Sequence, residues 1–174
     1  MARPTGFSLV EVLIALVVIA AGLLGLAKMQ ALSLSATKNA GSRGLIALQT
    51  ESLADLMHAN QAFWASGQAP ASFTVAGTSV TDATHVLDVA VANCQSRCTP
   101  ARLAAFDLHT WAADMNEQFP SYAAKVNCST DASTPINCII YVTWSEKSVA
   151  INRNSATGSA TQVTTESFSV YVKP

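Results

Sequence analysis

An unbroken apolar run near the N-terminus constrains the fold of this chain more than any other feature. The run extends from Phe7 to Ala27, and Glu11 is its only charged residue. At about 1.5 Å per residue, a helix over this run is roughly 31 Å long, which matches the hydrocarbon core of a bilayer. The sequence therefore predicts a membrane-spanning helix over residues 7–27, followed by a polar region that folds in water.

Two other interpretations explain less of this run. A secretory signal peptide has a charged leader, here Arg3, and a small-x-small cleavage site, here residues 25–27. Its core is uncharged, however, whereas this run contains Glu11 and is long for a signal peptide. A plain membrane anchor explains the length of the run but gives no joint role to Gly6, Phe7 and Glu11.

The first residues resemble the type IV prepilin family. A short basic leader, MARPTG, precedes the sequence FSLVE, and members of this family are cut after the glycine. The resemblance implies that a membrane aspartic peptidase, the prepilin peptidase, cleaves between Gly6 and Phe7 and methylates the new Phe7 amine. It also implies that Glu11, fifth in the mature chain, is the acidic assembly residue of the family. Residues 1–6 are then a leader peptide.

Physical chemistry gives Glu11 a role that does not depend on this resemblance. Cleavage creates a protonated amine at Phe7, and an unpaired ammonium or carboxylate is costly to bury among apolar helices. The two groups can offset one another. Because they lie one helical turn apart, the pairing is either internal or made with a neighbouring subunit, and the sequence leaves both open.

The helical pattern continues beyond the apolar run. Gly41 and Gly44 are weak points, each costing about 1 kcal/mol relative to alanine, and we expect a bend or break there. Over residues 45–64 the apolar side chains fall on one helical face, and Gly67 ends the pattern. The sequence therefore predicts an N-terminal helix over residues 7–67 whose second part packs against a domain.

A second helix is predicted from Pro100 to Phe119. Thr99 is a suitable N-cap, proline is favoured at the first helical position, and Pro120 closes the segment. The expected core-facing side chains of this helix are Ala104, Leu108, Trp111, Met115 and Phe119.

Segments with β-type composition flank the second helix. Two short strands are expected within residues 71–92, and further strands around residues 124–126, 139–144 and 168–172. Residues 145–165 are rich in small polar residues and predict mostly loop, with one strand considered at residues 149–151. The expected fold class is α+β: a long N-terminal transmembrane and amphipathic helix, then a pilin-like head domain, residues 68–174, with a second helix and an antiparallel sheet.

Four cysteines follow the apolar run: Cys94, Cys98, Cys128 and Cys138. If the run carries them across a membrane, they enter an oxidising compartment. Their spacings are not those of common zinc sites and the three histidines are scattered, so disulfides are favoured over a metal. Bonds 94–98 and 128–138 are favoured because each pair is close in sequence, and a crossed pairing stays open.

No recognised catalytic pattern is present in the sequence. Asp107, Asp114 and Glu117 on the second helix fit a solvated face, because no histidine or nucleophile accompanies them in a known order. The chain has no phosphate-binding glycine loop. We therefore expect no enzymatic activity, cofactor, metal or small-molecule substrate. The formal net charge of -1 and the dispersed lysines and arginines also argue against nucleic acid as a partner.

Two later segments resemble one branch of the pilin family. The sequences ALQTESLADLMHANQ and LAAFDLHTW, the latter followed by FP, are similar to PilV-type minor pilins, or pilus-modification proteins. This resemblance implies a minor pilin that is incorporated in the pilus or primes its assembly, and so serves adhesion and motility. The implied partners are the prepilin peptidase, other minor and major pilins, and inner-membrane lipid.

The same resemblance implies a location and leaves two alternatives. The head domain is expected in the periplasm, held to the inner membrane by one span, and then in the pilus at the cell surface. A type II secretion pseudopilin is the first alternative, although the length and two cysteine pairs fit a minor pilin better. A DNA-uptake pilin is the second, and it would need a basic stripe that the sequence lacks.

Overall fold

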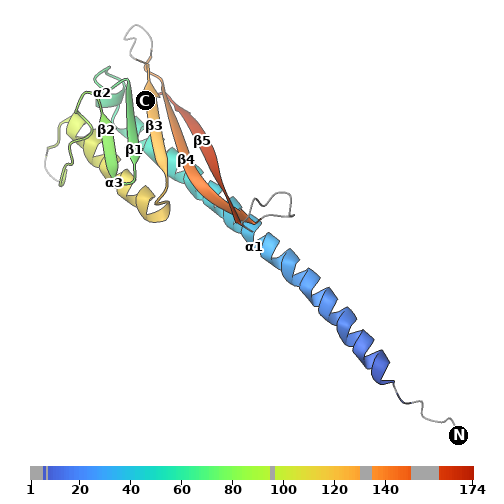
Figure 1. The fold of residues 1–174 in the computed structure, drawn as a ribbon. Coiled ribbons are helices and arrows are strands. Elements are labelled where there is room, and N and C mark those ends of the chain that lie inside the picture. Colours follow the sequence, from blue (N-terminus) through green and yellow to red (C-terminus); the bar gives the residue numbers. More distant parts are fainter. Residues whose placement is uncertain (1–5, 7, 95–96, 130–134, 150–160) are drawn as a thin grey trace. The chain divides into compact units, whose positions relative to one another are not determined.

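The computed structural model describes residues 6, 8–94, 97–129, 135–149 and 161–174 of the protein. The chain divides into two compact units, residues 1–40 and 41–174. Its elements in chain order are α1 (Leu9–Ala59), α2 (Gln61–Trp64), β1 (Ser72–Ala76), β2 (Ser79–Asp82), α3 (Pro100–Gln118), β3 (Ala123–Cys128), β4 (Cys138–Val149) and β5 (Thr161–Val172) (Figure 1). A long apolar helix thus precedes a small domain with a helix and an antiparallel sheet, which confirms the predicted α+β class.

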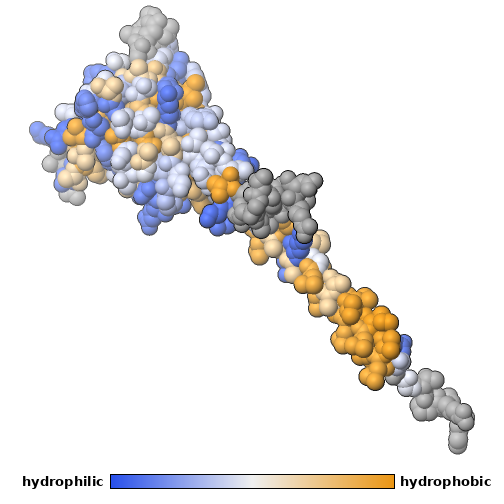
Figure 2. Space-filling model, viewed as in Figure 1, coloured by the Kyte–Doolittle hydropathy of each residue, from blue (hydrophilic) through white to orange (hydrophobic). Residues whose placement is uncertain are grey.

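The first unit consists of the N-terminal part of α1. Its leucine, valine and isoleucine side chains between Leu9 and Leu26 are 48% to 84% exposed. Figure 2 shows these apolar residues, in orange, gathered around the helix. Within the described residues, α1 is the one helix that is long and apolar enough to cross a membrane. So much exposed aliphatic surface is unfavourable in water, so lipid or other apolar helices are the suitable surroundings.

α1 continues without interruption through Gly41 and Gly44, so the predicted break at these glycines is wrong. Each glycine still costs about 1 kcal/mol in a helix interior. Contacts within the second unit offset this cost directly beside the glycines, since Arg43 binds Glu146 and Ile46 is completely buried. Tertiary contacts therefore outweigh the local propensity of the chain.

α1 ends at Ala59, earlier than the predicted end at Gly67. Asn60 leaves the helical conformation, with φ -118° and ψ 53°, and its side-chain amide donates to the carbonyl oxygen of Pro100 at 2.8 Å. The chain then forms the four-residue helix α2, whose two aromatic side chains are buried. The apolar spacing continues across this change of direction, which explains why the sequence predicts one helix instead of two.

The sheet is antiparallel, with the strand order β2-β1-β3-β4-β5. Two strands do occur within residues 71–92, but both end by Asp82, and residues 83–92 contain turns and no strand. β4 continues to Val149 and β5 begins at Thr161, so much of the predicted loop is strand. Of the strand considered at residues 149–151, Val149 ends β4 and the other two residues lie outside the described part of the chain.

The core of the second unit lies between one face of the sheet and the helices α1 and α3, which Figure 1 shows on the same side of the sheet. Trp111 on α3 joins the two helices, because its indole Nε1 donates to the carbonyl oxygen of Gln49 on α1 at 2.7 Å. The principal buried side chains are Ile46, Leu53, Met57, Phe73, Val75, Leu108, Trp111, Met115, Val126, Ile140 and Val142.

α3 has the boundaries and the buried face that its sequence predicts. The hydroxyl of the N-cap Thr99 accepts a hydrogen bond from the backbone N–H of Arg102 at 3.3 Å, and Pro100 lies in the first turn. Phe119 leaves the helical conformation directly before Pro120. Four of the five expected core-facing side chains are buried, and Phe119 is half-buried.

Candidate functional site

The candidate site starts where α1 starts. The carbonyl oxygen of Ser8 accepts hydrogen bonds from the backbone N–H groups of Glu11 (3.0 Å) and Val12 (3.2 Å), so the helix begins directly after the predicted cleavage position. Gly6 is exposed, and Phe7 lies outside the described residues. A Cβ atom added to Gly6 would meet no atom within 4 Å. Packing within this chain therefore does not require glycine at position 6.

Glu11 lies in the first turn of α1, where the partial positive charge of the helix terminus favours a carboxylate. Its side chain is exposed among aliphatic neighbours such as Val12 and Leu13. Within the described residues, no ion pair reaches Glu11. A carboxylate at the centre of a spanning helix costs about 2.5 to 3.5 kcal/mol. A cation close to the carboxylate would offset such a cost.

A second polar cluster lies within the second unit. The side chain of Glu146 on β4 is only 4% exposed, and it accepts hydrogen bonds from Arg43 Nε (3.2 and 3.3 Å) and Nη2 (3.1 Å). Trp144 Nε1 and Ser42 Oγ also donate to its Oε1 atom, at 2.9 and 3.2 Å. Arg43 forms a further ion pair with Glu166 on β5 at 3.1 Å. This cluster fastens α1 to the last two strands of the sheet.

The electrostatics of the cluster favour its ionised form. Burial alone would raise the pKa of Glu146, but hydrogen bonds from Arg43, Trp144 and Ser42, together with the charge of Arg43, hold that pKa below its usual value. The hydrogen bond to Glu146 and the charges of Glu146 and Glu166 raise the pKa of Arg43. Both oxygens of Glu146 have donors, so its role in this structure is to hold the helix in place.

Sequence reasoning missed this cluster because it assigned residues 145–165 mostly to a loop. In a strand, successive side chains alternate between the two faces, and Val142, Trp144 and Glu146 all face the core. The sequence signal for this cluster is therefore a carboxylate that continues a row of core-facing strand side chains. It predicts a cationic partner that reaches the carboxylate, here Arg43, whose own side chain is 53% exposed.

The cysteines form two disulfides, Cys94–Cys98 and Cys128–Cys138, which are the pairs favoured by their closeness in sequence. Cys128 and Cys138 lie directly opposite each other on β3 and β4, with Cα atoms 4.0 Å apart. The other bond closes a short loop ahead of α3. Within the described part of the chain, no cluster of histidine, cysteine and acidic side chains has the arrangement of a metal site.

The acidic residues of α3 do not bond to one another. Asp107 is half-buried, and this burial raises its pKa, whereas Asp114 and Glu117 are exposed. None of the three makes a hydrogen bond or ion pair with another described residue. The structure therefore brings together Arg43, Glu146 and Glu166. Asp107 and Asp114 line one surface cavity without bonding to each other, and Glu117 does not line it.

Comparison with known proteins bears on the N-terminal part of the site. The family model of the prokaryotic N-terminal methylation motif matches residues 1–27, which include Gly6, Phe7, Glu11 and the apolar run. No curated protein and no solved structure matches the chain. The matched motif implies processing by prepilin peptidase and assembly with other pilins, and the apolar helix indicates anchoring in a membrane. Together these observations support a type IV pilin-like or pseudopilin protein.

Proposed function

We propose that this protein is a PilV-type minor pilin, which is cleaved between Gly6 and Phe7 and joins or primes a type IV pilus. The observation that carries the proposal is the methylation motif, which includes an exposed apolar run over residues 7–27 whose one charged residue is Glu11. A Cβ atom added to Gly6 would meet no atom of the described residues within 4 Å, which fits a glycine that a peptidase must recognise. The head domain then lies in the periplasm before assembly.

The proposed mechanism of assembly rests on Glu11 and the amine of Phe7. Lipid surrounds the apolar part of α1 before assembly, and other pilin helices replace the lipid afterwards. In this second environment the Glu11 carboxylate is stabilised by an ammonium group, because a buried charge without a partner is costly. The methylated amine of Phe7, in the same subunit or in a neighbour, supplies that cation.

The second unit supports this role by linking the helix to the head. The Arg43 and Glu146 cluster, and the burial of Ile46, Leu53 and Met57, make the C-terminal part of α1 a component of the head's core. These contacts hold the C-terminal part of α1 to the sheet. This coupling is useful for a subunit that is extracted from a membrane into a filament.

Replacement of Glu11 by valine tests the mechanism. The variant is more hydrophobic, so membrane insertion and cleavage after Gly6 should be retained, but an unpaired Phe7 ammonium should cost roughly 3 to 5 kcal/mol in the assembly. We expect Glu11→Val protein to be absent from sheared pili and from complexes with other pilins. Glu51→Val is the matched control, because Glu51 is an exposed glutamate on the same helix beyond the apolar run. Equal incorporation of both variants would refute the mechanism.

Deletion of the gene distinguishes the proposed role from its alternatives. Piliation, exoprotein secretion and transformation should be scored separately in the same strain. We expect piliation to fall while secretion persists, and restoration by the wild-type chain. A defect confined to secretion would identify a pseudopilin, and a defect confined to transformation would identify a DNA-uptake pilin.

A further inference from the structure

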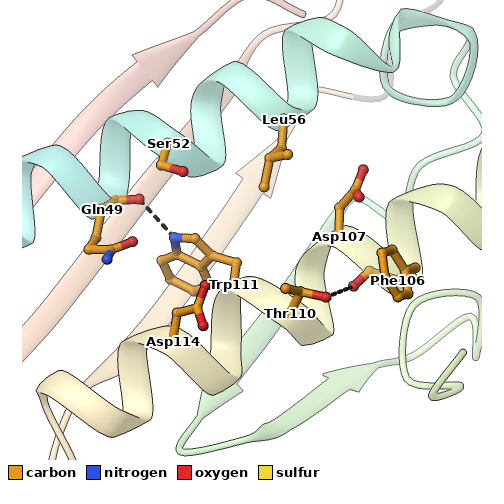
Figure 3. A pocket seen from close by; sticks show the side chains of 8 residues that line it. All are labelled: Gln49, Ser52, Leu56, Phe106, Asp107, Thr110, Trp111 and Asp114. Atoms are coloured by element: carbon orange, nitrogen blue, oxygen red, sulfur yellow. Dashed lines mark hydrogen bonds between the residues drawn. The ribbon is translucent and has the colours of Figure 1, made fainter. Parts of the chain in front are cut away.

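A surface cavity of about 240 Å³ lies between the second-unit part of α1 and α3. Figure 3 shows the side chains of both helices around it. α1 contributes an amide, a hydroxyl and an apolar side chain, and α3 contributes two carboxylates, a hydroxyl and two aromatic rings. The lining residues are Gln49, Ser52, Leu56, Phe106, Asp107, Thr110, Trp111 and Asp114.

The carboxylates of Asp107 and Asp114 line this cavity without a hydrogen bond or ion pair to another described residue, as do the Gln49 amide and the Ser52 hydroxyl. Trp111 Nε1 already donates to the Gln49 carbonyl oxygen at 2.7 Å, and Thr110 Oγ1 donates to the Phe106 carbonyl oxygen at 2.9 Å. Asp107, by contrast, is half-buried without a hydrogen bond or ion pair to another described residue, and this burial raises the pKa of its carboxyl. No lysine or arginine lines the cavity. A cation that enters the cavity would give the Asp107 carboxylate an ion-pair partner and would favour its charged form.

The cavity also suits the rest of a basic side chain. The methylene stems of lysine and arginine pack on apolar surface while their charged ends reach polar groups. Leu56, which is half-buried on the cavity wall, provides such a surface.

An exposed apolar stripe on α1 leads to the cavity. Leu45 is 48% exposed and Leu48 is 64% exposed, and these residues lie one turn before Gln49 and Ser52, respectively. A free amine would leave these leucines in water, whereas a protein surface packed along α1 would cover them. The stripe therefore favours a macromolecular partner over a small molecule.

We propose that this cavity receives the side chain of a lysine or arginine from a neighbouring pilin subunit packed along α1. The carboxylates of Asp107 and Asp114 favour a basic side chain as the occupant, and the adjacent leucine stripe favours one that belongs to a protein partner. This inference rests on the proposed function and deepens it, because it names the chemistry by which the head selects its neighbour.

The first test removes the carboxylate charges without changing their size. The double variant Asp107→Asn, Asp114→Asn is expressed as the full chain in cells, beside Glu117→Gln as the matched control. Glu117 is an exposed acid of the same helix that does not line the cavity. We expect recovery of the double variant with other pilins to fall about tenfold, as for loss of a charged hydrogen bond, and the control to match wild type.

A stability measurement separates docking from folding. Because Asp107 has no partner among the described residues and its burial disfavours charge, Asp107→Asn should not lower the thermal unfolding temperature of the purified full chain. Asp107→Lys places a cation where one should bind, and it should reduce recovery more than Asp107→Asn does. Normal recovery of all these variants would overturn the proposal.

Photo-crosslinking identifies the occupant. p-Benzoylphenylalanine is placed at Thr110, an exposed residue on the cavity wall, and cross-linked peptides are mapped by mass spectrometry. We expect a pilin peptide whose attachment point lies within one helical turn of a lysine or arginine. Attachment to a segment without a basic residue, or no attachment in assembled pili, would contradict the proposal. Absence of the wild-type chain both from pili and from complexes with other pilins would instead show that the proposed function itself is wrong.

Discussion

Replacement of Leu53 by alanine measures how firmly α1 is built into the head. Leu53 is 1% exposed and packs in the core between α1, α3 and the sheet. Leucine-to-alanine changes at such sites cost about 2 to 5 kcal/mol, because they combine lost burial with a residual cavity. We take about 3 kcal/mol for this position, which corresponds to a decrease in Tm of roughly 10 °C for a unit of this size.

Leu48 supplies a control with the same chemistry on the same helix. It is 64% exposed, so Leu48→Ala should change the free energy of unfolding by less than about 0.5 kcal/mol. The assay is thermal unfolding of the full chain in detergent, followed by near-ultraviolet circular dichroism of its tryptophans. Equal decreases in Tm for the two variants would show that the C-terminal part of α1 is not part of the head's core.

Two further predictions concern the head. Because the folded-state pKa of Glu146 lies below the ordinary value of 4.5, its contribution to stability is complete above that value and is lost as the pH falls through the lowered pKa. Urea unfolding at a series of acidic pH values should show this loss of stability in the wild type. If the free energy of unfolding of Glu146→Gln depends on pH as steeply as that of the wild type, the prediction is contradicted. Removal of the 128–138 disulfide by paired serine substitutions should cost about 2 to 5 kcal/mol. Loss of the 94–98 bond should cost less, because its sequence separation is 4 instead of 10, and calorimetry showing equal costs would refute this ranking.

Much of the fold is predictable from local signals in the sequence. The apolar run predicts the first helix, and Thr99 followed by Pro100 predicts the start of α3. The closeness of the cysteines favours the two disulfides that the structure contains. These features succeed because the determining residues are adjacent in the chain or separated by whole helical turns.

The failures occur where distant contacts decide the outcome. Gly41 and Gly44 remain helical because of Arg43 and the core beside them, and nothing local reveals that support. Asn60 ends α1 through a bond to Pro100, which is far away in sequence. Small polar residues extend β4 and β5 because the two strands pair with each other along their whole length. Composition alone cannot report such a pairing.

The candidate site divides in the same way. The position of Glu11 in the apolar run is visible in the sequence, and a local motif match accompanies it. The cavity between α1 and α3 is not visible, because it exists only when Trp111 approaches Gln49. Asp107 and Asp114 can be noticed as acids on one helix, but their relation to Leu56 requires the fold.

Intact mass spectrometry of the protein recovered from sheared pili tests whether the chain is processed as a prepilin. We expect a chain that begins at Phe7, carries one added methyl group on its amine, and contains two disulfides. The same preparation from cells lacking prepilin peptidase should contain no such chain. A protein that begins at Met1 or at Lys28 in assembled pili would contradict the account.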